Sequence, residues 1–152
     1  MPDITPFLWF DKEAEEAARF YVSIFPNSKI DKTVHSNDSV PVKAGSVLTV
    51  EFELDGKRFT ALNGGPMFKF TEAVSFVVPC KDQAEIDYYW SALSAGGEEQ
   101  CGWLKDKFGL SWQVVPETLP ALLTGPRAKD VMAAILTMKK LDLAALERAS
   151  RG

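Results

Sequence analysis

Hydrophobic and polar positions alternate most clearly over residues 47–54, where even-numbered positions are apolar and positions 49, 51 and 53 are polar. A period of two is typical of a strand with one buried face. Asp55-Gly56 follows as a two-residue hairpin signal, and Arg58–Asn63 is predicted to return as the partner strand. A weaker strand over 29–35 and a long polar loop over 36–46 precede this hairpin.

A second alternating stretch, Trp103–Pro116, is predicted to form two short strands around a bend at Asp106 to Gly109. Side chains alternate along the second strand, so Trp112 and Gln113 point to opposite faces. Gln113 stands out because it is polar among large apolar neighbours.

A strand and a helix come before each hairpin. Ile4–Phe10 is an apolar run that reads as a strand, and Asp11 is the predicted N-cap of the helix after it. Val74–Val78 is the second such strand, and its helix is predicted to be capped by Asp82 and ended by Gly96-Gly97. The order of elements therefore repeats.

This repeat predicts an α+β fold built from a duplicated module, with Phe7–Phe10 corresponding to Ser75–Val78. We expect one domain over 1–152, with module one at about 1–66 and module two at about 72–116. Two short amphipathic helices are predicted over about 117–150, the last one capped by Asp142.

Composition narrows the classes of partner. Hydrophobic residues make up 46% of the chain, enough for a packed core. The net charge is -4 and no basic run is present, which argues against nucleic acid or an anionic membrane as a partner. The apolar runs are too short to span a bilayer, and the N-terminus lacks the features of a secretory signal. Cys80 and Cys101 form no Cys-x-x-Cys pair, so a cytoplasmic protein with reduced thiols is expected.

Seven stretches share a family resemblance, and together they span almost the whole chain: Phe-Leu-Trp-Phe-Asp (7–11), Glu-Glu-Ala-Ala-Arg-Phe-Tyr (15–21), Ile-Phe-Pro-Asn-Ser (24–28), Ala-Leu-Asn-Gly-Gly-Pro (61–66), Ser-Phe-Val-Val-Pro-Cys (75–80), Cys-Gly-Trp-Leu-Lys-Asp-Lys-Phe-Gly-Leu-Ser-Trp-Gln-Val-Val-Pro (101–116) and Met-Lys-Lys-Leu-Asp (138–142). They resemble the PhnB-like proteins, also labelled demethylubiquinone 3-methyltransferase-like. These proteins belong to the glyoxalase/bleomycin-resistance/dioxygenase group, the vicinal oxygen chelate superfamily.

The resemblance implies paired β-α-β-β-β modules that form a curved mixed sheet around a cup, and it implies a homodimer. Members with known chemistry place a divalent metal in the cup. Each module supplies two ligands, usually His, Glu or Gln, from its first and last strands.

Carried onto this chain, the metal positions retain one suitable ligand. The first-strand positions fall at Pro6 or Phe7 and at Ser75, and the late-strand positions at Thr60 or a neighbour and at Gln113. Of these, only Gln113 is a plausible metal ligand. The single histidine, His35, lies in the weak strand, and the strand carboxylates Glu51 and Glu53 are interpreted as solvated residues. We therefore predict no standard metal site and no cofactor, with a divalent metal as the alternative.

The methyltransferase label also lacks its sequence signal. A methyl donor such as S-adenosylmethionine commonly lies on a glycine-rich turn after the first strand of a Rossmann-like sheet. This chain has Gly64-Gly65 and Gly96-Gly97, which we interpret as breakers, and no Gly-x-Gly. The sequence therefore does not support the label.

A cup lined by aromatic walls and a few polar groups remains, and such a cup suits a flat organic ligand. Its predicted ligand-binding residues are Phe7, Trp9, Asn63, Ser75, Trp112 and Gln113. Each has an alternative structural role. The aromatic residues could fill a core, Asn63 could be a turn residue and Ser75 could hydrogen-bond across the sheet. A buried Gln113 needs hydrogen-bond partners, from the protein or from a ligand.

Two functions are consistent with these observations. The first is a binding protein of the bleomycin-resistance type, which holds a small organic molecule without metal. The second is a lyase, isomerase or dioxygenase of the superfamily with unusual metal ligands, so the sequence leaves catalysis open. Cys101, near Lys105 and Lys107, is either a reactive thiol or, our preferred interpretation, a buried inert one.

Overall fold

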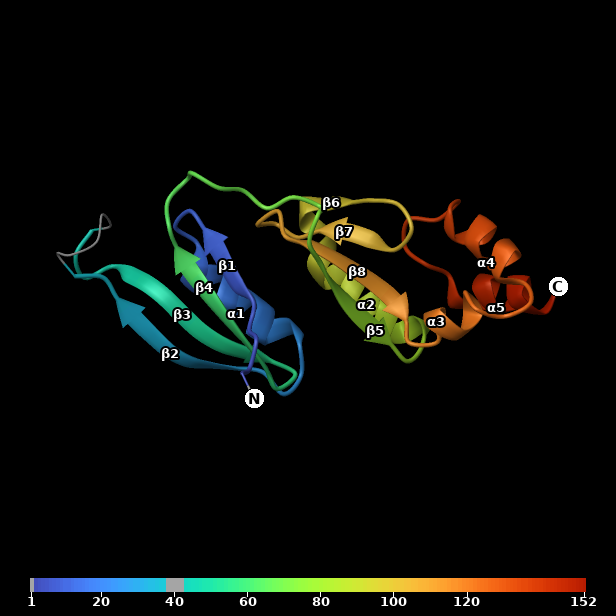
Figure 1. Cartoon of the computed structure of the whole chain (residues 1–152), viewed down its shortest axis with the longest axis horizontal. Helices are drawn as coiled ribbons and strands as arrows, with labels where there is room; N and C mark the ends of the chain where they lie inside the picture. The colour runs from blue at the N-terminus through green and yellow to red at the C-terminus, as the bar shows by residue number, and fades with distance from the viewer. Residues whose placement is uncertain (1, 38–42) are drawn as a thin grey trace. The chain divides into compact units, whose positions relative to one another are not determined.

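The structure is a computed structural model that describes residues 2–37 and 43–152. Part of the predicted loop over 36–46 therefore lies outside the described residues. The chain divides into two compact units, Met1–Lys69 (unit 1) and Phe70–Gly152 (unit 2), and each unit has its own sheet (Figure 1). In the described residues, no helix has the length and apolar composition needed to cross a membrane.

Unit 1 is a β-α-β-β-β module whose four strands form one mixed sheet in the order β1-β4-β3-β2. The first and last strands pair in parallel, and the other pairs are antiparallel. The elements are β1 (Phe7–Phe10), α1 (Ala14–Ile24), β2 (Lys29–His35), β3 (Val47–Leu54) and β4 (Lys57–Asn63). The weaker strand and the Asp55-Gly56 hairpin predicted from the sequence are confirmed.

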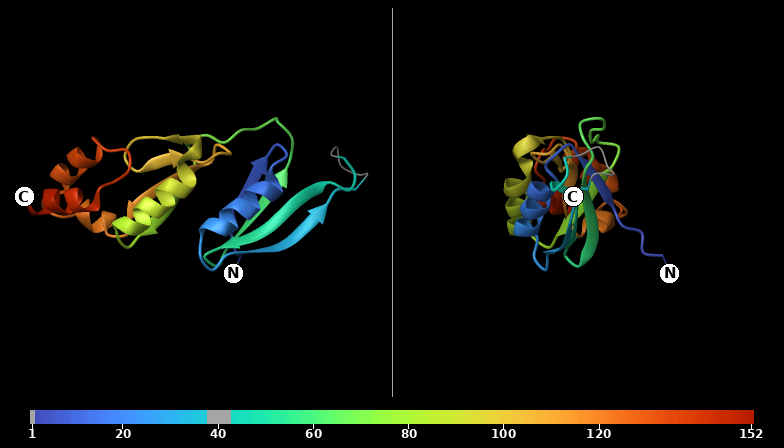
Figure 2. Two further views of the ribbon diagram at one scale, coloured as in Figure 1. Left: turned by 180° about the vertical axis from the view of Figure 1, so that it is seen from behind. Right: turned by 90° about the vertical axis from the view of Figure 1, so that its left-hand side faces the viewer.

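Helix α1 packs along one face of this sheet, and the described residues of the unit place no helix on the other face (Figure 2). The alternation of β3 explains the packing, because Val50, Phe52 and Leu54 turn their apolar side chains into the core. Tyr21 of α1 stacks on Phe52 at a centroid distance of 6.3 Å, and Phe52 stacks on Phe59 at 5.4 Å. This aromatic stack joins the helix to the two central strands.

The predicted N-cap of α1, Asp11, is wrong. The N-cap position falls on Glu13, whose side chain makes no capping hydrogen bond. Asn63 at the end of β4 supplies the acceptor instead, because its Oδ1 accepts from the backbone N–H of Ala14 at 2.8 Å. Its Nδ2 donates to the carbonyl of Val47 at 2.9 Å, so one amide ties the helix start to two strands.

Unit 2 repeats the module in the same strand order, β5-β8-β7-β6, again with parallel first and last strands. Its elements are β5 (Ser75–Cys80), α2 (Gln83–Leu93), the 3-10 turn η1 (Ser94–Gly96), β6 (Gly97–Glu98), β7 (Trp103–Lys105) and β8 (Ser111–Pro116). The α+β fold class and the duplicated module are therefore confirmed, with the strands forming two four-stranded mixed sheets.

Helix α2 begins as predicted and ends differently. Asp82 accepts a hydrogen bond from the Glu85 backbone N–H at 2.9 Å and so caps the helix. The helix stops at Leu93, before the two glycines, and continues as the 3-10 turn through Gly96. A Cβ atom on Gly96 would lie 1.8 Å from the carbonyl oxygen of Asp106, so this glycine permits close contact between the turn and β7.

Asp106 organises the β7–β8 bend from inside the core. Its carboxylate is fully buried and accepts from the backbone N–H groups of Phe108 at 2.9 Å and Leu110 at 3.1 Å. Its second oxygen accepts from the indole N–H of Trp112 at 2.8 Å. Hydrogen bonds of this number and length satisfy a buried carboxylate, so the bend has a fixed geometry.

The C-terminal helices belong to unit 2: α3 (Leu119–Leu122), α4 (Ala128–Ile135) and α5 (Leu143–Arg151). They enclose a cluster in which Val115 of β8 meets Val131, Ile135, Leu141 and Leu146. The predicted cap of the last helix is confirmed, because Asp142 accepts from the Ala145 N–H at 3.1 Å.

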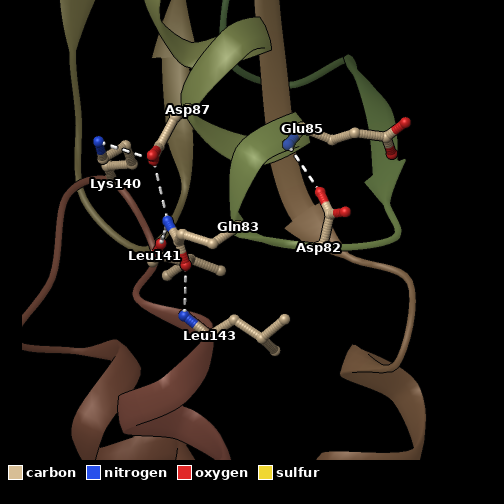
Figure 3. Close-up of polar contacts among 7 residues, drawn as sticks. All are labelled: Asp82, Gln83, Glu85, Asp87, Lys140, Leu141 and Leu143. Atoms are coloured by element: carbon tan, nitrogen blue, oxygen red, sulfur yellow. Dashed lines mark hydrogen bonds and ion pairs between the residues drawn. The ribbon is translucent and has the colours of Figure 1, made fainter.

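Gln83 of α2 connects the module to the C-terminal segment (Figure 3). Its Nε2 donates to the carbonyl of Leu141 at 3.1 Å and to Asp87 at 3.0 Å. Its Oε1 accepts from the Leu143 N–H at 2.8 Å, in the first turn of α5. Lys140 pairs with Asp87 at 2.9 Å, so the segment before α5 is held at several points.

Candidate functional site

The face of the second sheet turned away from α2 carries the polar residue that stood out in the sequence. Strand register places Val77, Gln113 and Trp103 in one row, and Ser75, Ser111 and Lys105 in the next. Side chains alternate along each strand, so all six belong to the same face, which we call the open face of unit 2. Val115 continues this face but is covered, because it packs in the cluster with Val131, Ile135, Leu141 and Leu146, which we call the C-terminal cluster.

Gln113 and Ser75 are in contact on the open face. The Gln113 Nε2 donates to the Ser75 Oγ at 3.0 Å, and both side chains are half-buried. The serine therefore hydrogen-bonds across the sheet, as one of the two predicted alternatives states. The hydrogen bond orients the amide of Gln113 and uses one of its donors, while its carbonyl oxygen can accept from a ligand.

Trp112 lies on the opposite face of β8, in the core. Only 4% of it is exposed, its indole N–H is bound to Asp106, and its ring lies 5.6 Å from that of Phe76. The half-buried Trp103 pairs directly with Gln113 and is the tryptophan of the open face. Trp103 is absent from the predicted ligand-binding residues, because the register of β7 against β8 that places it beside Gln113 is not a local signal. The alternation along β8, in contrast, already separates Trp112 from Gln113.

The three predicted ligand residues of unit 1 also divide between faces. Phe7 is 60% exposed and pairs with Thr60 on the face away from α1. Asn63 turns toward α1 and serves as its cap. The structure does not test the role of any of the six predicted residues in ligand binding, so that role stays a prediction.

Trp9 shares the face of Phe7 and is covered by the chain that follows β4. Its indole N–H donates to the carbonyl of Gly65 at 2.9 Å, and Phe68 packs edge-on at 4.9 Å. A Cβ atom on Gly64 would lie 2.4 Å from the Trp9 ring, so the close approach requires glycine there.

A shallow concavity of about 500 Å³ lies on unit 1 beside Thr60. Its charged lining consists of Asp3, Asp31, Glu51, Glu53 and Arg58. Several of these charges are already paired. Arg58 binds Asp3, and Lys29 lies 3.6 Å from Glu53. Glu51 is exposed, as the interpretation of a solvated strand residue requires, whereas Glu53 is half-buried and paired.

The donor groups at the four family metal positions do not fit a divalent transition metal. In unit 1, Phe7 lies opposite Thr60, which offers a single hydroxyl. In unit 2, Ser75 and Gln113 are hydrogen-bonded to each other. Such a metal prefers imidazole, thiolate or carboxylate ligands that converge. Across residues 2–37 and 43–152, no three His, Cys, Asp or Glu side chains gather where they could hold a metal ion.

The two thiols lie in different surroundings. Burial raises the pKa of the Cys80 thiol to about 12, so this group stays protonated at neutral pH. Cys101 is half-buried, and it packs against the C-terminal cluster. Its φ of 64° places it in the left-handed region, where its N–H donates to the carbonyl of Met138 at 2.8 Å.

Lys105 on the open face of unit 2 forms an ion pair with Glu72. The hydrogen bond between them lowers the pKa of Glu72 and raises that of Lys105. Lys105 is also close enough to Glu99 for that carboxylate to raise the pKa of the ammonium further.

The sequence profile of the 3-demethylubiquinone-9 3-methyltransferase family matches residues 2–115, which include both modules. The chain belongs to this PhnB-like family. A Bacillus cereus PhnB protein that carries the same methyltransferase name is 34% identical, with a TM-score of 0.68, and the match covers 75% of this chain and 99% of that one.

Two further solved structures are similar to this chain, and the first of them shares its fold. Protein PA1353 from Pseudomonas aeruginosa is 18% identical with a TM-score of 0.60, over 76% of this chain and 98% of that one. A glyoxylase/bleomycin resistance protein/dioxygenase domain from Frankia sp. EAN1pec is 12% identical with a TM-score of 0.48, over 76% and 93%. No curated protein matches the chain. The family profile stops inside β8, so α3, α4 and α5 lie beyond the match.

Proposed function

We propose that this PhnB-like protein binds a small organic molecule on the open face of unit 2 without using a metal. The Gln113–Ser75 pair carries the proposal, because it holds an amide in a defined orientation beside an aromatic residue. Polar groups that are oriented before binding lose little freedom when a ligand arrives.

The chemistry of this face suits recognition of a flat or ring-containing ligand. Trp103 offers an aromatic surface directly beside Gln113, and Val77, 55% exposed, extends the apolar area on the other side. Gln113 provides an acceptor, and the neighbouring serine hydroxyl adds a second polar group. Phe7 and Trp9 remain predicted contacts from unit 1. We further expect a cytoplasmic homodimer with no nucleic-acid or membrane partner.

A methyltransferase or a metal-dependent lyase, isomerase or dioxygenase has less support. The two glycine pairs serve packing, since Gly64 makes room for Trp9 and Gly96 for the Asp106 carbonyl. The family metal positions offer hydroxyls and one amide in place of imidazoles and carboxylates, so we derive no step through a metal.

Native mass spectrometry of protein purified without added metal or chelator tests the proposal. We expect a dimer that carries no stoichiometric metal, and any organic adduct should survive treatment with a chelator. Gln113→Ala should reduce adduct occupancy and, through loss of the hydrogen bond to Ser75, lower the free energy of unfolding by only about 1 kcal/mol, whereas Gln100→Ala, at an exposed glutamine of the same unit, should change neither quantity. One divalent ion per subunit, lost together with the adduct in chelator, would contradict the proposal and favour the enzyme.

A further inference from the structure

Two buried side-chain oxygens in the described part of the chain lack a hydrogen-bond partner, Ser111 Oγ and Glu99 Oε1. Ser111 is fully buried. Buried polar atoms without partners are rare in native proteins, because each one loses its hydrogen bonds to water and gains none in return. Each of these two oxygens can therefore accept a hydrogen bond from a bound group.

Both oxygens belong to the open face of unit 2. The Glu99 N–H donates to the Trp103 carbonyl at 3.0 Å, which places Glu99 at the end of the row formed by Trp103 and Gln113. Ser111 lies in the adjacent row, paired with Lys105. Gly97 pairs with Lys105 on the other side, and a Cβ atom there would meet nothing within 4 Å. The edge of this face therefore has room beside Lys105.

The charged side chains around Lys105 favour a positively charged ligand. Glu72 and Glu99 both lie near one cation, Lys105, so the three groups sum to a net negative charge. A carboxylate only accepts hydrogen bonds, whereas a serine hydroxyl accepts and donates. The side chain of Trp103 adds an aromatic surface of the kind that attracts organic cations.

We propose that the open face of unit 2 binds the ammonium group of an organic amine, with Glu99 and Ser111 accepting its N–H bonds and Trp103 beside it. This inference rests on the proposed function and names the chemical class of its ligand. Lys105, which pairs with Ser111 across the strands, is long and unbranched, so a change of its rotamer without backbone movement can open the way to the hydroxyl while Gln113 stays bonded to Ser75.

Three probes that share a benzyl or phenyl ring and differ in charge test the inference: benzylamine, benzyl alcohol and benzoate. Each is titrated into the ¹⁵N-labelled full chain, and binding is followed by the shifts of the Trp103 indole and the Glu99 and Ser111 amides. We expect benzylamine to bind about tenfold more tightly than benzyl alcohol, and benzoate to bind most weakly.

Glu99→Gln should weaken benzylamine binding about tenfold and leave benzyl alcohol unchanged, because it removes the charge and keeps the shape. Glu98→Gln is the matched control. It makes the same change on an exposed neighbour that pairs with Leu104 on the other face. Equal effects of the two variants would overturn the inference.

Ser111→Ala separates a ligand contact from a structural role. The variant should weaken benzylamine binding and leave the thermal stability of the free protein unchanged or raised, because an unsatisfied hydroxyl is removed. Lower stability with unchanged binding would show that the hydroxyl stabilises the fold, for example through a buried water. That result would overturn the role of Ser111 as an acceptor for the ligand. If this variant does not fold, the Glu99 and Glu98 variants decide.

The probe panel also distinguishes the inference from the proposed function. Equal affinity for all three probes, with shifts on the open face, would overturn the preference for an amine and leave the binding surface supported. Shifts from no probe at Trp103, Glu99 or Ser111 would contradict both. Tighter binding of benzoate than of benzylamine would show that the face prefers an anion and would overturn the inference.

Discussion

The two units build the same strand order from different interactions. Unit 1 has a long edge strand, β2 with seven residues, beside the eight-residue inner strand β3, and it has an aromatic stack on Phe52. The corresponding strands of unit 2, β6 and β7, have two and three residues. Unit 2 instead contains the buried Asp106 carboxylate and three added helices. A single module topology is thus compatible with an apolar core and with one organised around a buried charge.

The starts of the two helices show the same contrast on a smaller scale. In unit 2 the cap of α2 is Asp82, three residues before the N–H that it binds. In unit 1 the acceptor for α1 is Asn63, which lies 49 positions away in the sequence. Local capping stabilises the helix alone, whereas capping by Asn63 also fixes the helix against β3 and β4.

Replacing Asp106 should have the largest effect and should be confined to unit 2. Asp106→Ala leaves three donors, two of them buried, without an acceptor, so we expect a loss of about 3–5 kcal/mol in the free energy of unfolding. Hydrogen exchange should quicken in β7 and β8, with β3 and β4 unchanged. Trp112→Phe removes one of the three donors and should cost about 1–2 kcal/mol. Equal losses from both variants would contradict the role of the carboxylate.

Alkaline pH offers a second way to separate the units, because both cysteines lie in unit 2. The raised pKa of Cys80 means that the unfolded thiol, near 9.0, ionises before the folded one, near 12. The unfolded state therefore loses its proton first, and stability falls as pH rises from 9 to 12, by up to about 1.4 kcal/mol per pH unit. Denaturant unfolding of wild type and Cys80→Ala should show a shallower decline in the variant. Identical slopes of unfolding free energy against pH in the two proteins would contradict a raised pKa of Cys80 in the folded state.

The capping contrast predicts unequal losses from two short side chains. Asn63→Ala removes two hydrogen bonds that join three elements, and we expect a cost of about 2 kcal/mol. Asp82→Ala removes one exposed cap and should cost about 1 kcal/mol. Chemical denaturation monitored by circular dichroism measures both. A larger loss of unfolding free energy from Asp82→Ala than from Asn63→Ala would contradict the prediction that the long-range cap contributes more than the local one.

The smallest expected effect concerns the attachment of the C-terminal helices. Gln83→Ala should cost about 1 kcal/mol, because the apolar cluster around Leu141 and Leu146 keeps the helices in place. Amide exchange should nevertheless quicken at Leu143 and in the first turn of α5, while β5 stays protected. Gln100→Ala, at an exposed position, is the control and should change neither quantity.

The sequence predicts what depends on neighbours along the chain. The alternation of β3, the Asp55-Gly56 hairpin and the caps Asp82 and Asp142 are local signals, and the structure confirms them. The cap from Asn63 depends on the parallel pairing of β1 with β4, which no local pattern encodes. The predicted cap Asp11 is therefore wrong, although aspartate is a residue type that favours the N-cap position.

In the candidate site, too, some features follow from the local sequence and others depend on how the strands pair. A hydrogen bond from Ser75 across the sheet is one of the predicted alternatives, and the structure identifies its partner as Gln113. Trp112 is a predicted residue of the cup, although strand alternation already places it on the face opposite Gln113, and the structure buries it in the core. The unsatisfied oxygens of Ser111 and Glu99 depend on enclosure by several strands and so required the structure.

The parallel pairing of first and last strands has a consequence for the order of events during protein synthesis. Phe7 pairs with Thr60, so β1 leaves the ribosome long before its partner exists. Ser75 pairs with Ser111, which closes a shorter loop. The module made first must wait longer for its closing strand, and until β4 emerges, the unpaired edge of β1 is open to other chains.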